Sequence, residues 1–304
     1  MVGIPKKSKH VIFKPKAAIR TDSNGNKQIY SGTNHPANPV AVFYQDTIGP
    51  RDTISFYCIQ DSGDTLKKWS NFENIEGYEF LKLKSGSNRL EFNLREKPAK
   101  SFDGMVLWWA GLQAPKPKPG NYRLLVKGIN YVDTTILTIS TNPLYDVSEE
   151  AVKSQYTFIK KIRDRIDESH KAIIQMRGIR KQLNEFCEQI APDSNTAELF
   201  KYKDRIDSAL VNIESELYQT KSKSNQDPIN YPIKLTNKLA HLIALYEHGQ
   251  YPPTDQAEQY LKEIDNLIEI QLNAYHSILQ NELKQFNFML RHQEIDFIRP
   301  FIVK

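Results

Sequence analysis

The stretch 134-TTILTISTNPLYDVSEEAVKSQYTFIKKI-162 decides the fold, because its pattern of apolar side chains changes part-way along. Residues 134–139 are rich in β-branched side chains, which is typical of a β-strand. After Pro143, Ser148 and two acids form the pattern of a helix N-cap, and apolar residues then recur every three or four positions. The sequence therefore predicts strands before this stretch and helices after it.

Upstream of this stretch, β-branched and aromatic residues gather in seven further short runs, which predict the remaining strands of one small sandwich. These runs are residues 11–15, 40–44, 53–60, 66–69, 89–94, 105–109 and 122–126. DSGD at 61–64 and GIN at 128–130 are typical of hairpin turns, so we expect antiparallel pairing. The segment APKPKPG at 114–120 lacks backbone donors at its prolines and predicts an exposed, extended loop.

Downstream, the apolar stripe predicts two helices of about forty residues, one from Ser148 and one from Thr254, by its spacing of three and four. Two shorter helices are expected between them, from about 195 to 217 and from 233 to 248, the latter ending at Gly249. Either four helices form an antiparallel up-and-down bundle, or three do with the middle pair acting as one broken helix. Both topologies stay open from the sequence.

The predicted class is thus α+β with two domains, which suits a chain of 304 residues. We expect a basic tail over 1–10, an Ig-like antiparallel β-sandwich over 11–143 and a helical bundle over 144–304. Cys58 falls in a strand pattern and Cys187 on a helix, so a disulfide between them is not expected.

The net charge of +5 belongs to the start of the chain. Residues 1–20 carry six Lys and Arg and no acid, residues 21–146 carry fourteen against thirteen, and residues 147–304 carry twenty-one against twenty-three. Neither predicted domain has the basic face that nucleic-acid binding requires, so no nucleic-acid partner is expected. No run approaches the ~18 apolar residues of a membrane span, and the first ten residues lack a secretory signal's apolar core.

Several segments resemble a known type of protein. SFYCIQDSGDTLKKW at 55–69, GSNRLEFNLR at 86–95 and PGNYRLLV at 119–126 look like successive strands of the flagellar-hook-capping type of Ig-like domain. TNP at 141–143, IRDR at 162–165 and above all KSKSNQDPINYPIKLTNKL at 221–239 resemble the region that follows the β-propeller in bacterial sortilin-type, BNR-repeat proteins, often labelled glycosyl hydrolases.

This resemblance implies a secreted or periplasmic accessory region of a longer propeller protein. HVIFKP at 10–15 looks like the exit from a last propeller blade, whereas no blades are present in this chain. One departure is Phe92-Asn93, where the family's strand usually reads Trp-Asp. By resemblance, the hydrolase label belongs to the absent propeller, and the implied partner is an attached β-propeller or another protein.

The aromatic candidates for a ligand or docking surface are Trp69, Trp108 and Trp109, because exposed indoles stack on sugars or anchor partners. Adjacent residues of a strand point to opposite sides, so one of Trp108 and Trp109 must leave the core. A structural kink is predicted where residues before proline resist helix, with Tyr231 plugging the bend and Asn230 capping freed backbone groups. Its residues are Asp227, Pro228, Asn230, Tyr231 and Pro232.

The histidines and acids that could be considered for metal binding or catalysis are better interpreted as structural residues. His241 and His248 lie two helical turns apart, too far to share a zinc ion, while His170 and His276 are placed to face each other across the bundle. Asp164, Asp167 and Glu168 lie among basic residues and are interpreted as ion-pair partners rather than a glycosidase carboxylate pair.

The sequence therefore predicts a non-catalytic structural and interaction module with no metal or cofactor. The alternatives are an accessory part of a glycan-processing hydrolase and a stand-alone carbohydrate-binding protein, both of which depend on the tryptophans.

Overall fold

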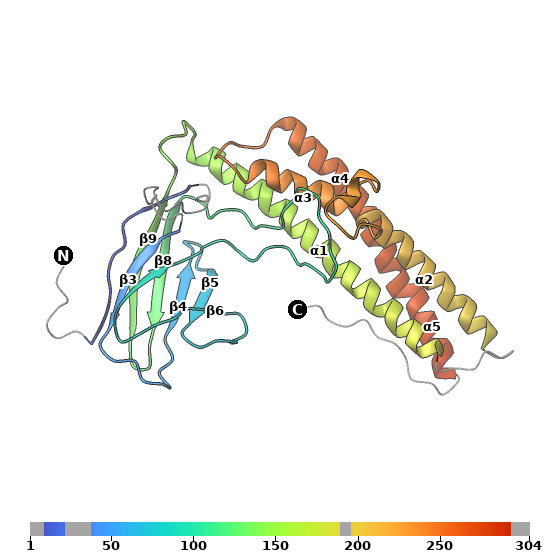
Figure 1. Ribbon diagram of the computed structural model, residues 1–304, viewed down its shortest axis with the longest axis horizontal. Coiled ribbons are helices and arrows are strands. Elements are labelled where there is room, and N and C mark those ends of the chain that lie inside the picture. Colours follow the sequence, from blue (N-terminus) through green and yellow to red (C-terminus); the bar gives the residue numbers. More distant parts are fainter. Residues whose placement is uncertain (1–8, 22–37, 189–195, 293–304) are drawn as a thin grey trace. The chain divides into compact units, whose positions relative to one another are not determined.

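The computed structural model describes residues 9–21, 38–188 and 196–292, and it confirms an α+β chain with two sheets followed by helices (Figure 1). The chain divides into two compact units. We call the first the sheet unit, formed by the described residues of Met1–Lys97, Pro115–Thr157 and Glu247–Pro252, and the second the helical unit, formed by those of Pro98–Ala114, Phe158–Tyr246 and Pro253–Lys304. The predicted boundary at 143 lies inside the sheet unit.

The strands of the described residues all belong to the sheet unit and match most of the predicted runs. They are β1 (His10–Ile12), β2 (Ala18–Ile19), β3 (Val40–Gln45), β4 (Ser55–Ile59), β5 (Thr65–Ser70), β6 (Glu79–Phe80), β7 (Gly86–Glu91), β8 (Gly120–Lys127) and β9 (Val132–Ser140). One sheet has the order β1-β3-β7 and the other β2-β9-β8-β4-β5-β6. The short β2 and β6 were not predicted, and they pair in parallel with β9 and β5.

The inward side chains of both sheets form one hydrophobic core. Phe43 of β3 meets Phe56 of β4 edge to face at 5.4 Å between ring centroids, and Phe92 lies 5.0 Å from Trp69. Each such pair stabilises the unit beyond the apolar area that it buries. The two predicted hairpins are confirmed, since β4 pairs antiparallel with β5 and β8 with β9.

The strand predicted at 105–109 is wrong. This run is MVLWW, which is apolar at every position, and Gly104 and Trp109 at its ends have φ of +74° and +48°, outside the extended region. Met105 and Leu107 pack instead against the core of the helical unit. An uninterrupted apolar run cannot by itself distinguish a strand from another buried segment.

The segment 114–120 has no regular secondary structure before Gly120, where β8 begins, and it is not exposed. Ala114 and Lys116 are only 2% and 8% exposed. A lysine can be buried in this way because its long aliphatic stem packs like an apolar side chain. The expectation of an exposed proline-rich loop is therefore wrong.

The helices of the described residues are α1 (Glu149–Glu188), α2 (Ala197–Leu217), α3 (Leu235–Tyr246), α4 (Asp255–Ser277) and α5 (Leu283–His292), with a 3-10 turn η1 (Asp227–Ile229) and a π-helical segment η2 (Ile278–Glu282). Because η2 joins α4 to α5 without a break, the described residues have four separate long helical stretches. Of the two topologies left open by the sequence, the structure has the one with separate second and third helices.

Two helix starts have the N-caps predicted from the sequence. Ser148 Oγ accepts a hydrogen bond from the amide of Ala151 at 3.1 Å, and Thr254 Oγ1 accepts one from Ala257 at 3.2 Å. Such N-caps stabilise a helix by about 1 kcal/mol. The third helix ends at Tyr246 rather than at the expected Gly249, which lies three residues further on and has a left-handed φ of +67°.

Candidate functional site

Trp108 and Trp109 lie in a loop of the helical unit that α3 holds in place. The amide nitrogen of Trp108 donates to Oδ1 of Asn237 at 2.9 Å, and Nδ2 of Asn237 donates back to the carbonyl of Trp108 at 3.1 Å. Nε2 of His241 lies 2.5 Å from the same carbonyl. Asn237 and His241 are one helical turn apart on α3, so one face of this helix fixes the Trp108 backbone.

Trp109 projects from this fixed backbone into solvent. Its side chain is 83% exposed, and its φ of +48° is in the left-handed region that a bulky residue adopts only when its surroundings enforce it. The ring of half-buried Trp108 lies 6.5 Å from it at an interplanar angle of 63°. The result is a large apolar ring presented to solvent at a defined position.

Trp69, the third predicted surface tryptophan, is a core residue of the sheet unit. Its side chain is 2% exposed, and its indole N–H donates to the carboxylate of Glu79 at 3.1 Å. The structure therefore leaves Trp108 and Trp109 as the surface candidates. Sequence reasoning singled out the pair, but the strand geometry that it used for them does not occur.

At the predicted kink, the side chain that bonds free backbone amides is that of Asp227. Its carboxylate accepts hydrogen bonds from the amides of Lys223 and Ser224 at 2.5 and 2.9 Å, and these bonds hold the pKa of Asp227 below its ordinary value. Tyr231 is exposed and does not plug the bend. Pro228 lies within η1, and Asn230 and Pro232 follow it, so the proline-directed change of direction is present with a different cap.

The histidines do not form the arrangements considered from the sequence. His170 is fully buried, with Nδ1 2.6 Å from the carbonyl of Lys100 and its ring edge to face with Phe102, whereas His276 is exposed. The two therefore do not face each other in a shared core. Burial lowers the pKa of His170 and favours the neutral ring. Among the described residues no group of three or more His, Cys, Asp or Glu side chains is placed to hold a metal ion.

The three helical acids are ion-pair partners, as interpreted. Asp164 lies 3.3 Å from Lys160, Asp167 lies 2.8 Å from Lys171, and Glu168 lies 2.9 Å from Arg165. Asp167 also accepts a hydrogen bond from the amide of Lys100 at 2.7 Å.

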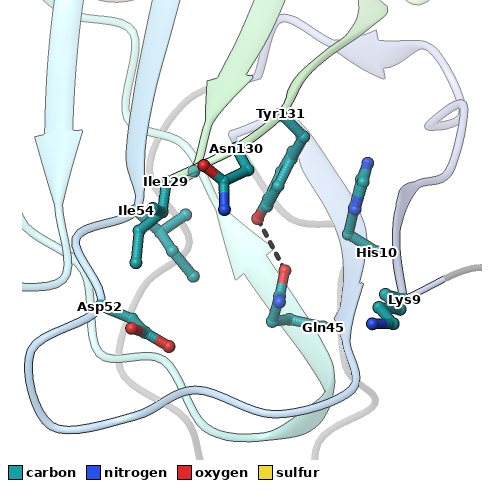
Figure 2. Close-up of a pocket in the computed structure, with 9 residues that line it drawn as sticks. Lys9, His10, Gln45, Asp52, Ile54, Ile129, Asn130 and Tyr131 are labelled. Atoms are coloured by element: carbon teal, nitrogen blue, oxygen red, sulfur yellow. Dashed lines mark hydrogen bonds between the residues drawn. The ribbon is translucent and has the colours of Figure 1, made fainter.

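The sheet unit has a separate pocket of about 580 Å³, which the sequence did not predict. Figure 2 shows its walls, formed by His10 of β1, Gln45 of β3, Asp52 and the 128–131 hairpin. The rings of His10 and Tyr131 stack at 3.6 Å, and the Tyr131 hydroxyl donates to Oε1 of Gln45 at 2.6 Å. The only sequence signal for this pocket was the hairpin at 128–130.

Gly128 makes the stacked arrangement possible. A Cβ at this position would lie 2.2 Å from Cε1 of Tyr131, far inside van der Waals contact. Burial, followed by the charges of Asp133 and Asp52, raises the pKa of Tyr131 to about 12, so its hydroxyl stays a hydrogen-bond donor at neutral pH. His10 covers one face of this ring, and Gly128 lies close to its Cε1 and Cζ atoms, so the ring is packed within the protein.

No family model, curated protein or solved structure matches this chain. Across residues 9–21, 38–188 and 196–292, none of the helices combines the length and the hydrophobicity that crossing a bilayer demands. The functional argument therefore depends on the chain's own geometry.

Proposed function

We propose that this chain is a non-catalytic interaction module and that Trp109 is its main anchor for a protein partner. The observation that carries the proposal is an indole that is 83% exposed on a backbone held by Asn237 and His241. Tryptophan is enriched among the residues that dominate binding energy, and fixing its backbone in advance reduces the entropy lost on association.

The finer fold and its context belong to the same proposal. The two sheets form an Ig-like sandwich, and the helices form an antiparallel up-and-down bundle. The module is the accessory region of a secreted or periplasmic bacterial β-propeller protein, and the partner is that propeller or a protein bound beside it. Support comes from the single core shared by both sheets and from the motif at 221–239.

Site-specific crosslinking tests the proposal. Benzoylphenylalanine replaces Trp109 in the full chain, which is then irradiated with the extracellular and periplasmic proteins of the source organism. The matched control carries the same group at Lys181, whose side chain is 74% exposed on α1. We expect a discrete protein adduct from position 109 alone, suppressed by excess unlabelled wild-type chain and not by Trp109→Ala. Equal adducts from both positions, or none that wild type suppresses, would refute the proposal.

A carbohydrate-binding function is the second candidate, because sugars also stack on an exposed indole. Trp69 is buried, so iodide quenching of tryptophan fluorescence reports chiefly on Trp109 with a smaller part from Trp108. Protection from iodide by one member of an oligosaccharide panel, lost in Trp109→Phe, would favour this function over a protein partner.

A further inference from the structure

The outward face of strands β9, β8, β4 and β5 is distinct from both sites described above. Alternate residues of each strand point away from the core, and the strand register aligns them in rows. One row contains Thr134, Leu125, Tyr57 and Lys68, and the next contains Ile136, Arg123 and Ile59. Figure 1 shows these strands side by side.

All charge on this face is positive. Lys68, Arg123 and Lys127 are exposed, and no Asp or Glu occupies an outward position on these four strands. Within the described residues, neither Arg123 nor Lys127 has a carboxylate partner, whereas most helical acids of the chain are paired. Lys68 lies 5.7 Å over the ring of Tyr78.

Among the remaining outward side chains, Leu125, Ile59, Ile136 and Val132 are apolar, and the others offer hydroxyls and amides. The hydroxyls of Tyr57 and Tyr78 lie 3.1 Å apart, so at most one of them donates to the other and the pair keeps a donor for a ligand. Thr138 Oγ1 donates to Asn121 Oδ1 at 2.8 Å, which leaves the amide nitrogen of Asn121 available. Thr134, which lies opposite Leu125 on β9, is exposed as well.

The spacing of the cations selects a ligand with repeated acidic groups. Arg123 and Lys127 are four residues apart on β8, about 13 Å along the strand, and Lys68 lies two strands away, about 10 Å. A single phosphate or carboxylate cannot contact all three. From this geometry we infer that the face binds an extended acidic polysaccharide, whose carboxylates or sulfates meet the cations and whose hydroxyls meet Tyr57, Asn121 and Thr134.

Other polyanions fit this face less well. An acidic peptide joins a sheet through the backbone of an edge strand, whereas β8 and β4 are central strands. A nucleic acid stacks its bases on open aromatic faces, whereas Tyr57 and Tyr78 meet edge to face at 79°. Hydroxyl and amide groups beside separated cations suit a sugar chain.

The test compares binding of the full chain to immobilised polygalacturonate and chondroitin sulfate, with neutral pullulan, polyglutamate and oligo-deoxythymidine as the other probes. The variant is Arg123→Gln/Lys127→Gln. The matched control is Lys201→Gln/Lys262→Gln, which removes the same charge from exposed positions on α2 and α4. Trp109→Ala separates this face from the proposed protein anchor, and thermal unfolding checks that each variant is folded.

We expect wild type to bind at least one of the two acidic polysaccharides and not pullulan. Affinity should fall roughly tenfold in Arg123→Gln/Lys127→Gln, the order expected for two lost charge-assisted contacts, and should be unchanged in the lysine control and in Trp109→Ala. The inference is overturned if neither polysaccharide binds, if both double variants weaken equally, or if polyglutamate or oligo-deoxythymidine binds as tightly as the polysaccharide.

Discussion

At the scale of single residues, Asn237 is the main support of the Trp109 site. Replacing Asn237 with Ala leaves the part-buried amide of Trp108 without its side-chain partner, whereas the carbonyl keeps His241. We expect a loss of about 1–3 kcal/mol in the free energy of unfolding in urea, because the amide loses its hydrogen bond. The near-ultraviolet circular dichroism of the tryptophans should weaken as well. Asn266→Ala, at an exposed position on α4, should change neither quantity.

Gly128 has the corresponding role in the sheet-unit pocket. Gly128→Ala places a methyl group 2.2 Å from the ring of Tyr131 and must displace it from its stack on His10. We expect a destabilisation of about 1–3 kcal/mol, as in other overpacked sites, and a downward shift of the pKa of about 12 in a spectrophotometric tyrosine titration. In Gly111→Ala, the nearest atom lies 3.8 Å away, so neither property should change.

His170 makes the stability of the helical unit depend on pH. Burial holds the pKa of His170 below its ordinary value of about 6.5, although its bond to Lys100 and the nearby Asp167 act in the opposite direction and Arg177 reinforces the shift. The unfolded chain therefore binds a proton more readily than the folded one. The contribution of His170 to the free energy of unfolding is fully present above about pH 6.5. It is lost as the pH falls through the pKa that His170 has in the folded protein.

Thermal unfolding at pH 7.5 and 5.5 measures this dependence. His170→Asn keeps a donor near the Lys100 carbonyl and removes the titration, so its midpoint should fall less on acidification than that of wild type. His276→Asn alters an exposed histidine and should retain the wild-type dependence. If the unfolding midpoint of His170→Asn falls on acidification as much as that of wild type, His170 is not the source of the pH dependence.

At the scale of elements, η2 explains an irregular apolar stripe. Buried residues of α4 recur every three or four positions up to Ile278, but the next one, Leu283, is five residues on. The wide π turn accommodates the extra residue and keeps Leu283, Phe286 and Leu290 on the buried face. The sequence alone does not show this step, because Leu279 is also apolar and lies four residues before Leu283.

Deleting exposed Gln280 should therefore be tolerated. The deletion removes the extra residue, turns η2 into ordinary α-helix and leaves the buried stripe with regular spacing. We therefore expect the free energy of unfolding to change by no more than about 1 kcal/mol. Deleting exposed Asn273 from uninterrupted α4 instead rotates all later residues by about 100° and should cost more than 3 kcal/mol. Chemical denaturation of both deletion variants shows whether η2 only accommodates an extra residue or is itself required for stability.

Elements with strong periodicity were predictable, and elements that depend on distant packing were not. The stripe of α1 and the caps at Ser148 and Thr254 define their helices locally, so these agreed with the structure. The run at 105–109 has strand-like composition, but its conformation is set by Asn237 and His241, which lie more than 120 residues away. The exposure of Trp109 and the basic sheet face likewise arise from register and tertiary packing.

At the scale of the whole molecule, a segment from between two strands completes the helical core. Ala99 is buried there, and Phe102, Met105, Leu107 and Leu112 pack against it. A fragment of residues 144–304, cut at the predicted boundary, lacks this segment. We expect it to bind the dye ANS, because its apolar core surface is uncovered. A synthetic 98–114 peptide should suppress that binding, whereas a scrambled peptide of the same composition should not.

The interleaving of the two units also constrains the order of events at the ribosome. Along the sequence, segments of the sheet unit and of the helical unit alternate three times, and Glu247–Pro252 is the last segment of the sheet unit. Many multidomain proteins fold their first domain while the second is still being synthesised. Here the buried core residues of the sheet unit all lie between Ile12 and Ile139, whereas its last segment, 247–252, follows most of the helices, so a nascent chain paused earlier has the sheet core but lacks that segment.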